Sequence, residues 1–145
     1  MSRKLSPEVA TWLRLGRIIS KMGPRLAAHL QQSGLTPAQF DILAHLLAAP
    51  GILQQELADQ QMVTKGNIVG LLDRMEQAGL LERRPHPEDG RAHLVYLTKR
   101  GELLASRVIP EHEAHVADCM SVLAPADLRM LHRLLSTLDR ALGPY

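Results

Sequence analysis

The segment from Thr64 to Asn67 carries side chains that suit the recognition of DNA bases. The sequence predicts a helix that begins here with Thr64 as its N-cap, so that these residues form the first turn. Asn67 has the donor and acceptor that match the major-groove edge of adenine, and Lys65 can bind guanine or a phosphate. Gly66 lets the backbone approach closely, and a helix N-terminus itself favours a phosphate. The pattern predicts contact with DNA; an ordinary polar helix start is the alternative.

A charged turn between two strand patterns predicts a second contact. The candidate strands are Leu80 to Arg84 and Ala92 to Leu97, which together form a hairpin. An arginine at the tip can enter a narrow A·T-rich minor groove, and we assign this role to Arg91. Asp89 lies two residues earlier, where it can orient Arg91 or brace the hairpin without touching DNA. Arg84 is a further predicted DNA contact.

Arg74 follows Asn67 by seven residues, which is about two helical turns. It can reach a phosphate from this position. It can also pair locally with Asp73, Glu76 or Glu82, and both interpretations stay open.

Apolar residues at three- and four-residue steps predict about six helices, which position these side chains. Pro24 predicts a kink or break in the first helix, and Pro110 predicts a bend in the fifth. The fold class is therefore mainly α with a small β-hairpin wing. The expected helices are Ser6 to Gln32, Ala38 to Ala48 behind the N-cap Thr36, Leu53 to Asp59, Thr64 to Gly79, Thr98 to Leu123 and Ala126 to Leu142.

The composition fits one domain of 145 residues with an aliphatic core, because aromatic residues make up only 3%. One cysteine excludes an internal disulfide framework, and no apolar run approaches the ~20 residues of a membrane span. We expect a cytoplasmic protein without a cofactor. The net charge is only +2, but residues 1–30 carry six Lys/Arg against one Glu, and residues 83–100 carry five basic against two acidic groups. These segments can attract phosphate, or they can be ordinary solvated surface.

Short motifs follow one another in a familiar order and spacing. They are LTPAQFDIL at 35–43, QELA at 55–58, VTKGN at 63–67, LDRME at 72–76, GLLER at 79–83, DGR at 89–91 and LTKRG at 97–101. Along nearly its whole length the chain resembles the MarR family of winged-helix transcriptional regulators. The resemblance implies a single domain, 1–145, with a winged helix-turn-helix lobe at 35–98 and dimerisation helices at 1–33 and 101–145. Gly90 departs from the family, which usually has a larger polar or basic residue there.

The broad apolar faces of the first, fifth and sixth helices also favour a homodimer, because a winged-helix lobe alone cannot cover them. The alternative is a monomer whose helices pack on their own lobe. A dimer predicts a pseudo-palindromic operator in double-stranded DNA, with half-sites about 34–36 Å apart. The family resemblance also implies repression, often relieved by a small molecule or by oxidation.

Regulation is less constrained by the sequence. The resemblance implies a ligand site between the dimer helices and the lobe, and a small aromatic or anionic effector would suit it. The candidate effector residues are Trp12, Arg17, Asp41 and His45. His112, His115 and Cys119 lie at i, i+3 and i+7 and could supply metal ligands, so a metal-responsive regulator is one alternative. An ordinary buried cysteine is the other interpretation of Cys119.

The sequence therefore predicts a dimeric, sequence-specific DNA-binding repressor that is not an enzyme. No grouping of nucleophile, base and acid is visible in it. The alternative from a different class is a protein-interaction module that uses the winged-helix lobe to dock a protein.

Overall fold

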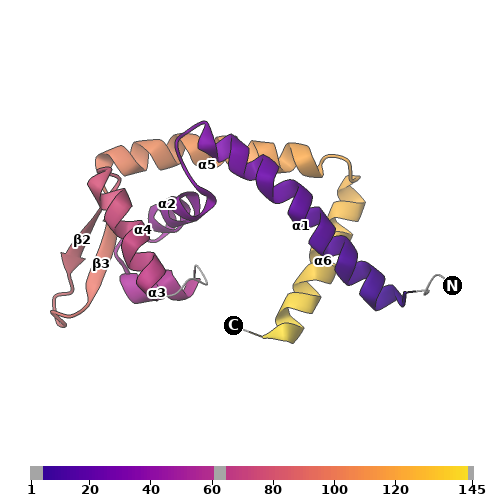
Figure 1. Ribbon diagram of the computed structural model, residues 1–145, viewed down its shortest axis with the longest axis horizontal. Helices are drawn as coiled ribbons and strands as arrows, with labels where there is room; N and C mark the ends of the chain where they lie inside the picture. The colour runs from indigo at the N-terminus through magenta and orange to yellow at the C-terminus, as the bar shows by residue number, and fades with distance from the viewer. Residues whose placement is uncertain (1–4, 61–64, 144–145) are drawn as a thin grey trace.

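The computed structural model describes residues 5–60 and 65–143 and confirms the predicted fold class, with helices and a small sheet (Figure 1). Most observed bounds differ from the predicted ones by one to three residues. The elements are α1 (Pro7–Gln31), α2 (Pro37–Ala48), β1 (Ile52–Leu53), α3 (Gln54–Gln60), α4 (Lys65–Gln77), β2 (Leu81–Pro85), β3 (His93–Leu97), α5 (Lys99–Met120) and α6 (Pro125–Leu142).

The elements form a lobe at one end of the molecule and a pair of extended helices at the other. In Figure 1, α2, α3, α4 and the sheet gather below the first half of α5, while the start of α1 and all of α6 project away from them. None of the described helices is long and apolar enough to cross a membrane.

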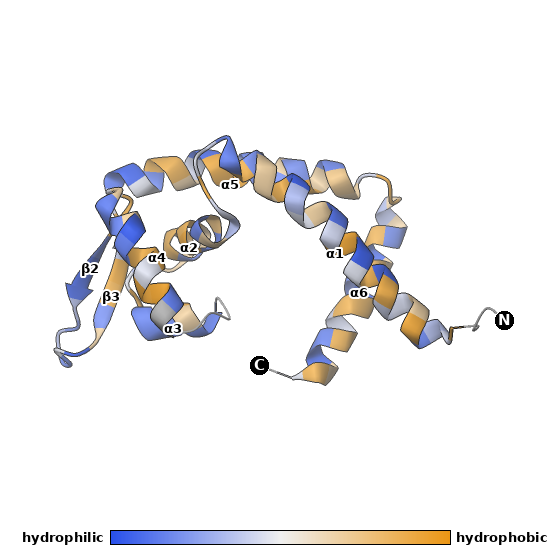
Figure 2. Cartoon of the chain, viewed as in Figure 1, coloured by the Kyte–Doolittle hydropathy of each residue, from blue (hydrophilic) through white to orange (hydrophobic). Residues whose placement is uncertain are grey.

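The buried core lies in the lobe and where the end of α1 and the first half of α5 pack on it. Among the described residues, every buried hydrophobic side chain falls between Leu30 and Val108, and no polar or charged side chain is buried. Leu57 and Ala58 of α3 face this core, and so do Ile68, Leu71, Leu72 and Met75 of α4. The apolar stripes of the two predicted HTH helices therefore hold α3 and α4 in the lobe (Figure 2).

A three-stranded antiparallel sheet with the order β1-β3-β2 anchors the wing. Leu81 pairs with Leu97 and Pro85 with His93, so the hairpin is in register over its full length. Ile52 of β1 pairs with Val95 on the other edge of β3. The sequence did not predict β1, because two residues are too few to show alternation.

Local side-chain chemistry fixes the helix ends. Thr36 and Gln39 form a reciprocal capping box at α2, with N–O distances of 2.9 and 3.2 Å. The Oγ1 of Thr98 accepts a hydrogen bond from the backbone N–H of Gly101 at 3.1 Å and caps α5. Gly79 has a φ of +69° and ends α4, with its own N–H bonded to the carbonyl of Glu76.

The break predicted at Pro24 is wrong, since α1 continues through it from Pro7 to Gln31. Pro110 likewise lies inside a continuous α5. Both prolines are exposed, so the carbonyl groups that lose an intrahelical donor can bond to water instead.

Candidate nucleic-acid interface

Two projecting features lie on one edge of the lobe. In Figure 1 the first turn of α4 and the tip of the β2–β3 hairpin both point away from α5, toward the lower edge of the view. A helix start and a hairpin tip on one edge can enter adjacent grooves of one DNA duplex. The fold thus supplies the geometry that the sequence predicts for DNA contact.

The structure describes only some of the residues at the start of α4 that the sequence predicts to read bases. Thr64 lies outside the described residues, and Lys65 and Gly66 are described only as backbone of the first helical turn. The side chain of Asn67 is exposed, while that of Ile68 beside it is buried. The core contact of Ile68 therefore orients the turn and leaves Asn67 on the surface.

Arg83 ties the wing to the back of α4, a contact that the sequence analysis missed. Its Nη2 lies 2.6 Å from Oδ1 of Asp73 and 2.5 Å from Oε2 of Glu76. Its backbone N–H also donates to Oε1 of Glu76 at 3.0 Å. The hydrogen bond from the Arg83 side chain holds the pKa of Glu76 below its ordinary value. The sequence signal for this contact was the pair of acidic residues three positions apart on α4, followed by an arginine on the next strand.

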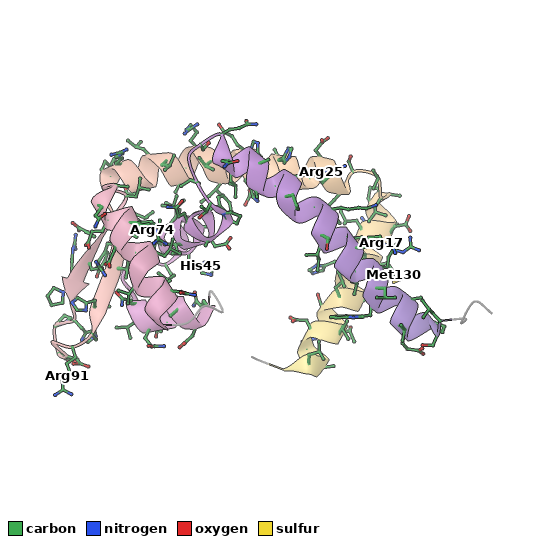
Figure 3. All side chains as sticks on the ribbon, viewed as in Figure 1. Arg17, Arg25, His45, Arg74, Arg91 and Met130 are labelled. Carbon is green, nitrogen blue, oxygen red and sulfur yellow. The ribbon has the colours of Figure 1, made fainter. Side chains whose placement is uncertain are left out.

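Arg74 does not pair with the acidic neighbours proposed for it. Asp73 and Glu76 bind Arg83, and Glu82 binds Arg84. Arg74 is exposed and makes no ion pair with any described residue (Figure 3). Its Nη1 lies 3.7 Å from the position that a Cβ of Gly70 would take, so the side chain extends back toward the start of α4. The local-pairing alternative is therefore wrong.

Arg84 has partners of its own on the wing. Its Nε donates to Oε1 of Glu82 at 2.9 Å, and its guanidinium lies 4.4 Å above the ring centre of Tyr96. Both partners keep the guanidinium over the sheet surface. Arg84 thus links neighbouring residues of the hairpin. Any contact of Arg84 with DNA must be made from this position over the sheet.

The tip of the wing presents Arg91. The backbone N–H of Arg91 donates to Oδ1 of Asp89 at 3.0 Å, and the N–H of Ala92 donates to the carbonyl of Asp89 at 3.0 Å. Asp89 therefore braces the turn, which is one of the two roles predicted for it. The side chain of Arg91 is exposed, extends beyond the hairpin (Figure 3), and makes no ion pair within the described part of the chain.

A histidine cluster lies where α1, α2 and α5 meet. The ring of His29 stacks on that of His115, with centroids 4.6 Å apart, and lies 6.2 Å from that of His112. His112 also packs on Phe40 at 4.4 Å. Burial, followed by the nearby His29 and His115, lowers the pKa of His112 below its ordinary value. Desolvation raises the pKa of the neighbouring Asp41 against the pull of His45 and His112.

The residues proposed for metal and effector binding do not converge as predicted. The rings of His112 and His115 lie beside that of His29, and within residues 5–60 and 65–143 no three His, Cys, Asp or Glu side chains are placed to hold a metal ion. The Nδ1 of His45 bonds to the carbonyl oxygen of Asp41 at 2.8 Å. Arg17 lies far from His45 on the projecting part of α1 (Figure 3), and Trp12 is on the same part of that helix. A single chain therefore does not assemble the four effector candidates into one pocket.

The lowered pKa of His112 predicts a stability that depends on pH. Folding favours the neutral ring, so this contribution is complete above the unfolded pKa of 6.5 and is lost as pH falls through the lower folded pKa. We expect the free energy of unfolding to fall from pH 7.5 to 5.5, and to fall less in His112→Gln. Urea denaturation at both pH values measures this. His132→Gln, which changes an exposed histidine of α6, is the control and should match the wild type.

Comparisons with known proteins agree with this architecture. A family model described as "MarR family" matches residues 33–92. An HTH-type transcriptional regulator from Bacillus cereus is 31% identical over 130 residues, covering 89% of this chain and 86% of that protein. AbsC, a MarR family transcriptional regulator from Streptomyces coelicolor, is 28% identical with a TM-score of 0.84, over 97% of this chain and 98% of AbsC. Sco3205 from the same organism, solved in complex with DNA, has the same fold at 23% identity with a TM-score of 0.87, over 99% of this chain and 93% of Sco3205.

The match in sequence and the match in fold thus cover the same nearly complete length. They include both the helix-turn-helix and the helices outside the lobe. The chain belongs to the MarR family of winged-helix transcriptional regulators.

Proposed function

We propose that this regulator binds a pseudo-palindromic operator in double-stranded DNA as a homodimer and represses transcription from it. In this proposal the first turn of α4, with Thr64, Lys65, Gly66 and Asn67, reads the major groove. Arg91 enters the minor groove beside it, and Arg74 and Arg84 contact the phosphate backbone.

The proposal rests on where the paired and the unpaired charges of the lobe lie. The acidic groups around α4 and β2 are bound by Arg83 and Arg84, away from the wing tip. Arg91 is left exposed at the tip, on the same edge as the start of α4. A cation without a carboxylate partner is suited to a phosphate or to the negative potential of a narrow minor groove.

The homodimer is supported by apolar surface that the chain itself does not cover. None of the residues of α6 is buried, although the helix carries a leucine stripe. Trp12 and Ile19 of α1 are 72% and 70% exposed. A cavity of about 450 Å³ between the start of α1 and Leu138 of α6 is almost wholly apolar in its lining. The monomer alternative places the first, fifth and sixth helices on their own lobe, and the lack of any buried residue in α6 argues against it. In the proposed homodimer, a second copy of the chain covers this apolar surface.

Selection from random duplexes tests this function directly. The proposal predicts two inverted half-sites with centres one helical turn apart, about 34–36 Å. A reporter gene placed behind the selected site should then be expressed less when the regulator is present. Recovery of a single, asymmetric half-site would contradict the dimeric arrangement, and recovery of no preferred sequence would favour the protein-interaction alternative.

The wing assignment predicts the effect of Arg91→Ala. We expect weaker operator binding and a loss of A·T preference at the positions that flank each half-site, with the dimer intact. Fluorescence anisotropy with operators that carry A·T or G·C at those positions measures both effects. Arg107→Ala is the control, because it removes an exposed arginine of α5 that is not among the proposed DNA contacts. Unchanged affinity in Arg91→Ala would remove the wing from the interface.

A further inference from the structure

One face of α1 carries a row of positive charges that the proposed function does not use. Arg14, Arg17, Lys21 and Arg25 follow one another at steps of three and four residues, so their side chains share one face of the helix. All four residues are exposed. These four residues are the basic stripe, which is about 16 Å long at a rise of about 1.5 Å per residue.

The basic stripe has no counter-charge in the described structure. No acidic residue lies between Arg14 and Arg25, and the one acidic residue of α1, Glu8, belongs to its first turn. None of the four basic residues makes an ion pair within residues 5–60 and 65–143. Like charges three or four positions apart destabilise a helix, whereas an ordinary exposed helix face mixes both signs. The stripe therefore costs α1 stability, which a bound polyanion would restore.

The charge of the whole chain is distributed so that a polyanion is attracted to α1. Residues 7–31 carry four basic groups and one acidic group. Residues 32–124, which hold the lobe and α5, carry eight basic and twelve acidic groups. The excess of positive charge thus lies outside the lobe, and α1 holds the largest share of it. Long-range attraction therefore favours a second contact with an anion, separate from the contacts that the lobe makes.

The basic stripe stays accessible when the apolar face of α1 is covered. By helical spacing, Trp12 and Ile19 lie on the face of α1 opposite to the stripe. A second copy of the chain that covers this apolar face leaves the stripe on the outside of the homodimer. In Figure 3, Arg17 and Arg25 lie on the side of the molecule opposite to Arg91. A molecule bound along the stripe would therefore not occupy the space of a duplex held by the lobe.

The chemistry of the basic stripe favours a DNA duplex over other polyanions. Three of its four residues are arginines, whose guanidinium groups bind phosphate with two parallel hydrogen bonds. A duplex carries one phosphate charge per about 1.7 Å of its axis, so a stripe of about 16 Å meets several phosphates at once. Residues 14–25 include no aromatic side chain that could stack on unpaired bases. The apolar side chains that a lipid surface requires are on the opposite face, where the second copy covers them.

We propose that the basic stripe binds the phosphate backbone of a second DNA duplex, whatever its sequence, while the lobes hold the operator. The homodimer carries two stripes and would bridge the operator to a neighbouring segment of DNA. Contacts with phosphate alone make this binding weaker than operator binding and sensitive to salt. Bridging rests on the proposed function, whereas the binding of a duplex by the stripe does not require an operator.

Fluorescence anisotropy with a random-sequence duplex tests the stripe without an operator. Every protein in this comparison also carries Lys65→Gln/Arg91→Gln, which removes two proposed contacts of the lobe. The stripe variant is Arg14→Gln/Arg17→Gln/Lys21→Gln/Arg25→Gln. We expect it to bind the duplex at least about ten-fold more weakly at about 50 mM salt, with a salt dependence that is smaller by about three phosphate contacts. Arg14→Lys/Arg17→Lys/Arg25→Lys keeps the charge and should keep most of the binding.

The matched control removes the same charge from exposed positions on α5 and α6. It is Arg100→Gln/Arg107→Gln/Arg129→Gln/Arg140→Gln, and it should bind the duplex like its parent. Equal losses in this control and in the stripe variant would refute the proposal, because net charge alone would then explain both. An unchanged affinity in the stripe variant would also refute it. Loss of binding to phosphatidylglycerol vesicles, with duplex binding unchanged, would assign the stripe to a membrane instead.

Bridging is measured with operator duplex fixed on beads and a labelled random-sequence duplex in solution. The unaltered protein should retain the labelled duplex on the beads, whereas the stripe variant with an intact lobe should hold the operator but release the labelled duplex. Loss of the operator itself in the stripe variant would place the stripe in the operator interface and refute a second site. Failure to select any operator, with duplex binding by the stripe intact, would overturn the proposed function alone.

Discussion

Gly101→Ala is expected to destabilise the lobe by about 3 kcal/mol or more, the upper end of what overpacking costs. A Cβ built on Gly101 would lie 1.9 Å from the carbonyl oxygen of Leu80 and 2.9 Å from its carbonyl carbon. These are backbone atoms, so no flexible side chain can move aside.

The backbone around Leu80 is also held from the other side. The N–H of Thr98 donates to that same Leu80 oxygen at 3.1 Å, and Oγ1 of Thr98 donates to the carbonyl of Gly79 at 2.6 Å. Relief of the clash would break the junction between the end of α4, the start of β2 and the cap of α5. Loss of this junction would also loosen the orientation of the recognition helix.

Urea denaturation of Gly101→Ala measures the loss, and Gly70→Ala is the matched control. Gly70 lies within α4, where an added Cβ meets only the flexible end of Arg74 at 3.7 Å. That variant should be as stable as the wild type or up to about 1 kcal/mol more stable, because alanine favours a helix over glycine. If Gly101→Ala unfolds within about 0.5 kcal/mol of the wild type, α5 does not pack against Leu80 as described.

Leu134→Glu is expected to weaken the homodimer at least about 100-fold, equivalent to about 3 kcal/mol. Leu134 is 59% exposed on α6, so the substitution should not disturb the fold of one chain. In a two-fold dimer it places two carboxylates in an apolar interface, one from each copy, and neither has a partner there. Operator affinity should fall with the dimer, since a monomer can hold only one half-site.

Sedimentation velocity over a range of concentrations measures the dimer, and Thr137→Glu is the control. Thr137 is exposed on the same helix but lies outside the leucine stripe, so it makes the same change in charge away from the expected interface. An unaltered dimer in Leu134→Glu would show that the leucine stripe of α6 is not the interface. Equal dissociation of both variants would mean that charge alone, and not burial, caused the effect.

Local signals in the sequence were enough for the helices and for the wing. Thr36 and Thr98 mark helix starts in the sequence, and the structure shows both residues as N-caps. Gly79 likewise marks the end of α4 in the sequence, because glycine adopts the positive φ at this position without steric cost. The buried faces of α3 and α4 followed from apolar spacing, which needs no knowledge of distant contacts.

Contacts between distant elements could not be predicted in the same way. The stacking of His29 on His115 depends on how α1 crosses α5, and β1 exists only because Ile52 meets Val95. Arg83 falls within a predicted strand of the hairpin, but its pairing with Asp73 and Glu76 depends on the packing of β2 against α4. These pairings come from tertiary structure, and one sequence carries no direct record of them.

Binding to DNA from upstream of the protein's own gene tests the central claim most directly. Fluorescence anisotropy would compare that fragment with a shuffled one over a series of salt concentrations. The account predicts tight binding to the native fragment alone, with affinity falling at least about 100-fold between about 50 and about 200 mM salt, as several phosphate contacts require. Absence of binding to either fragment at low salt would contradict the account and favour a protein as the partner of the lobe.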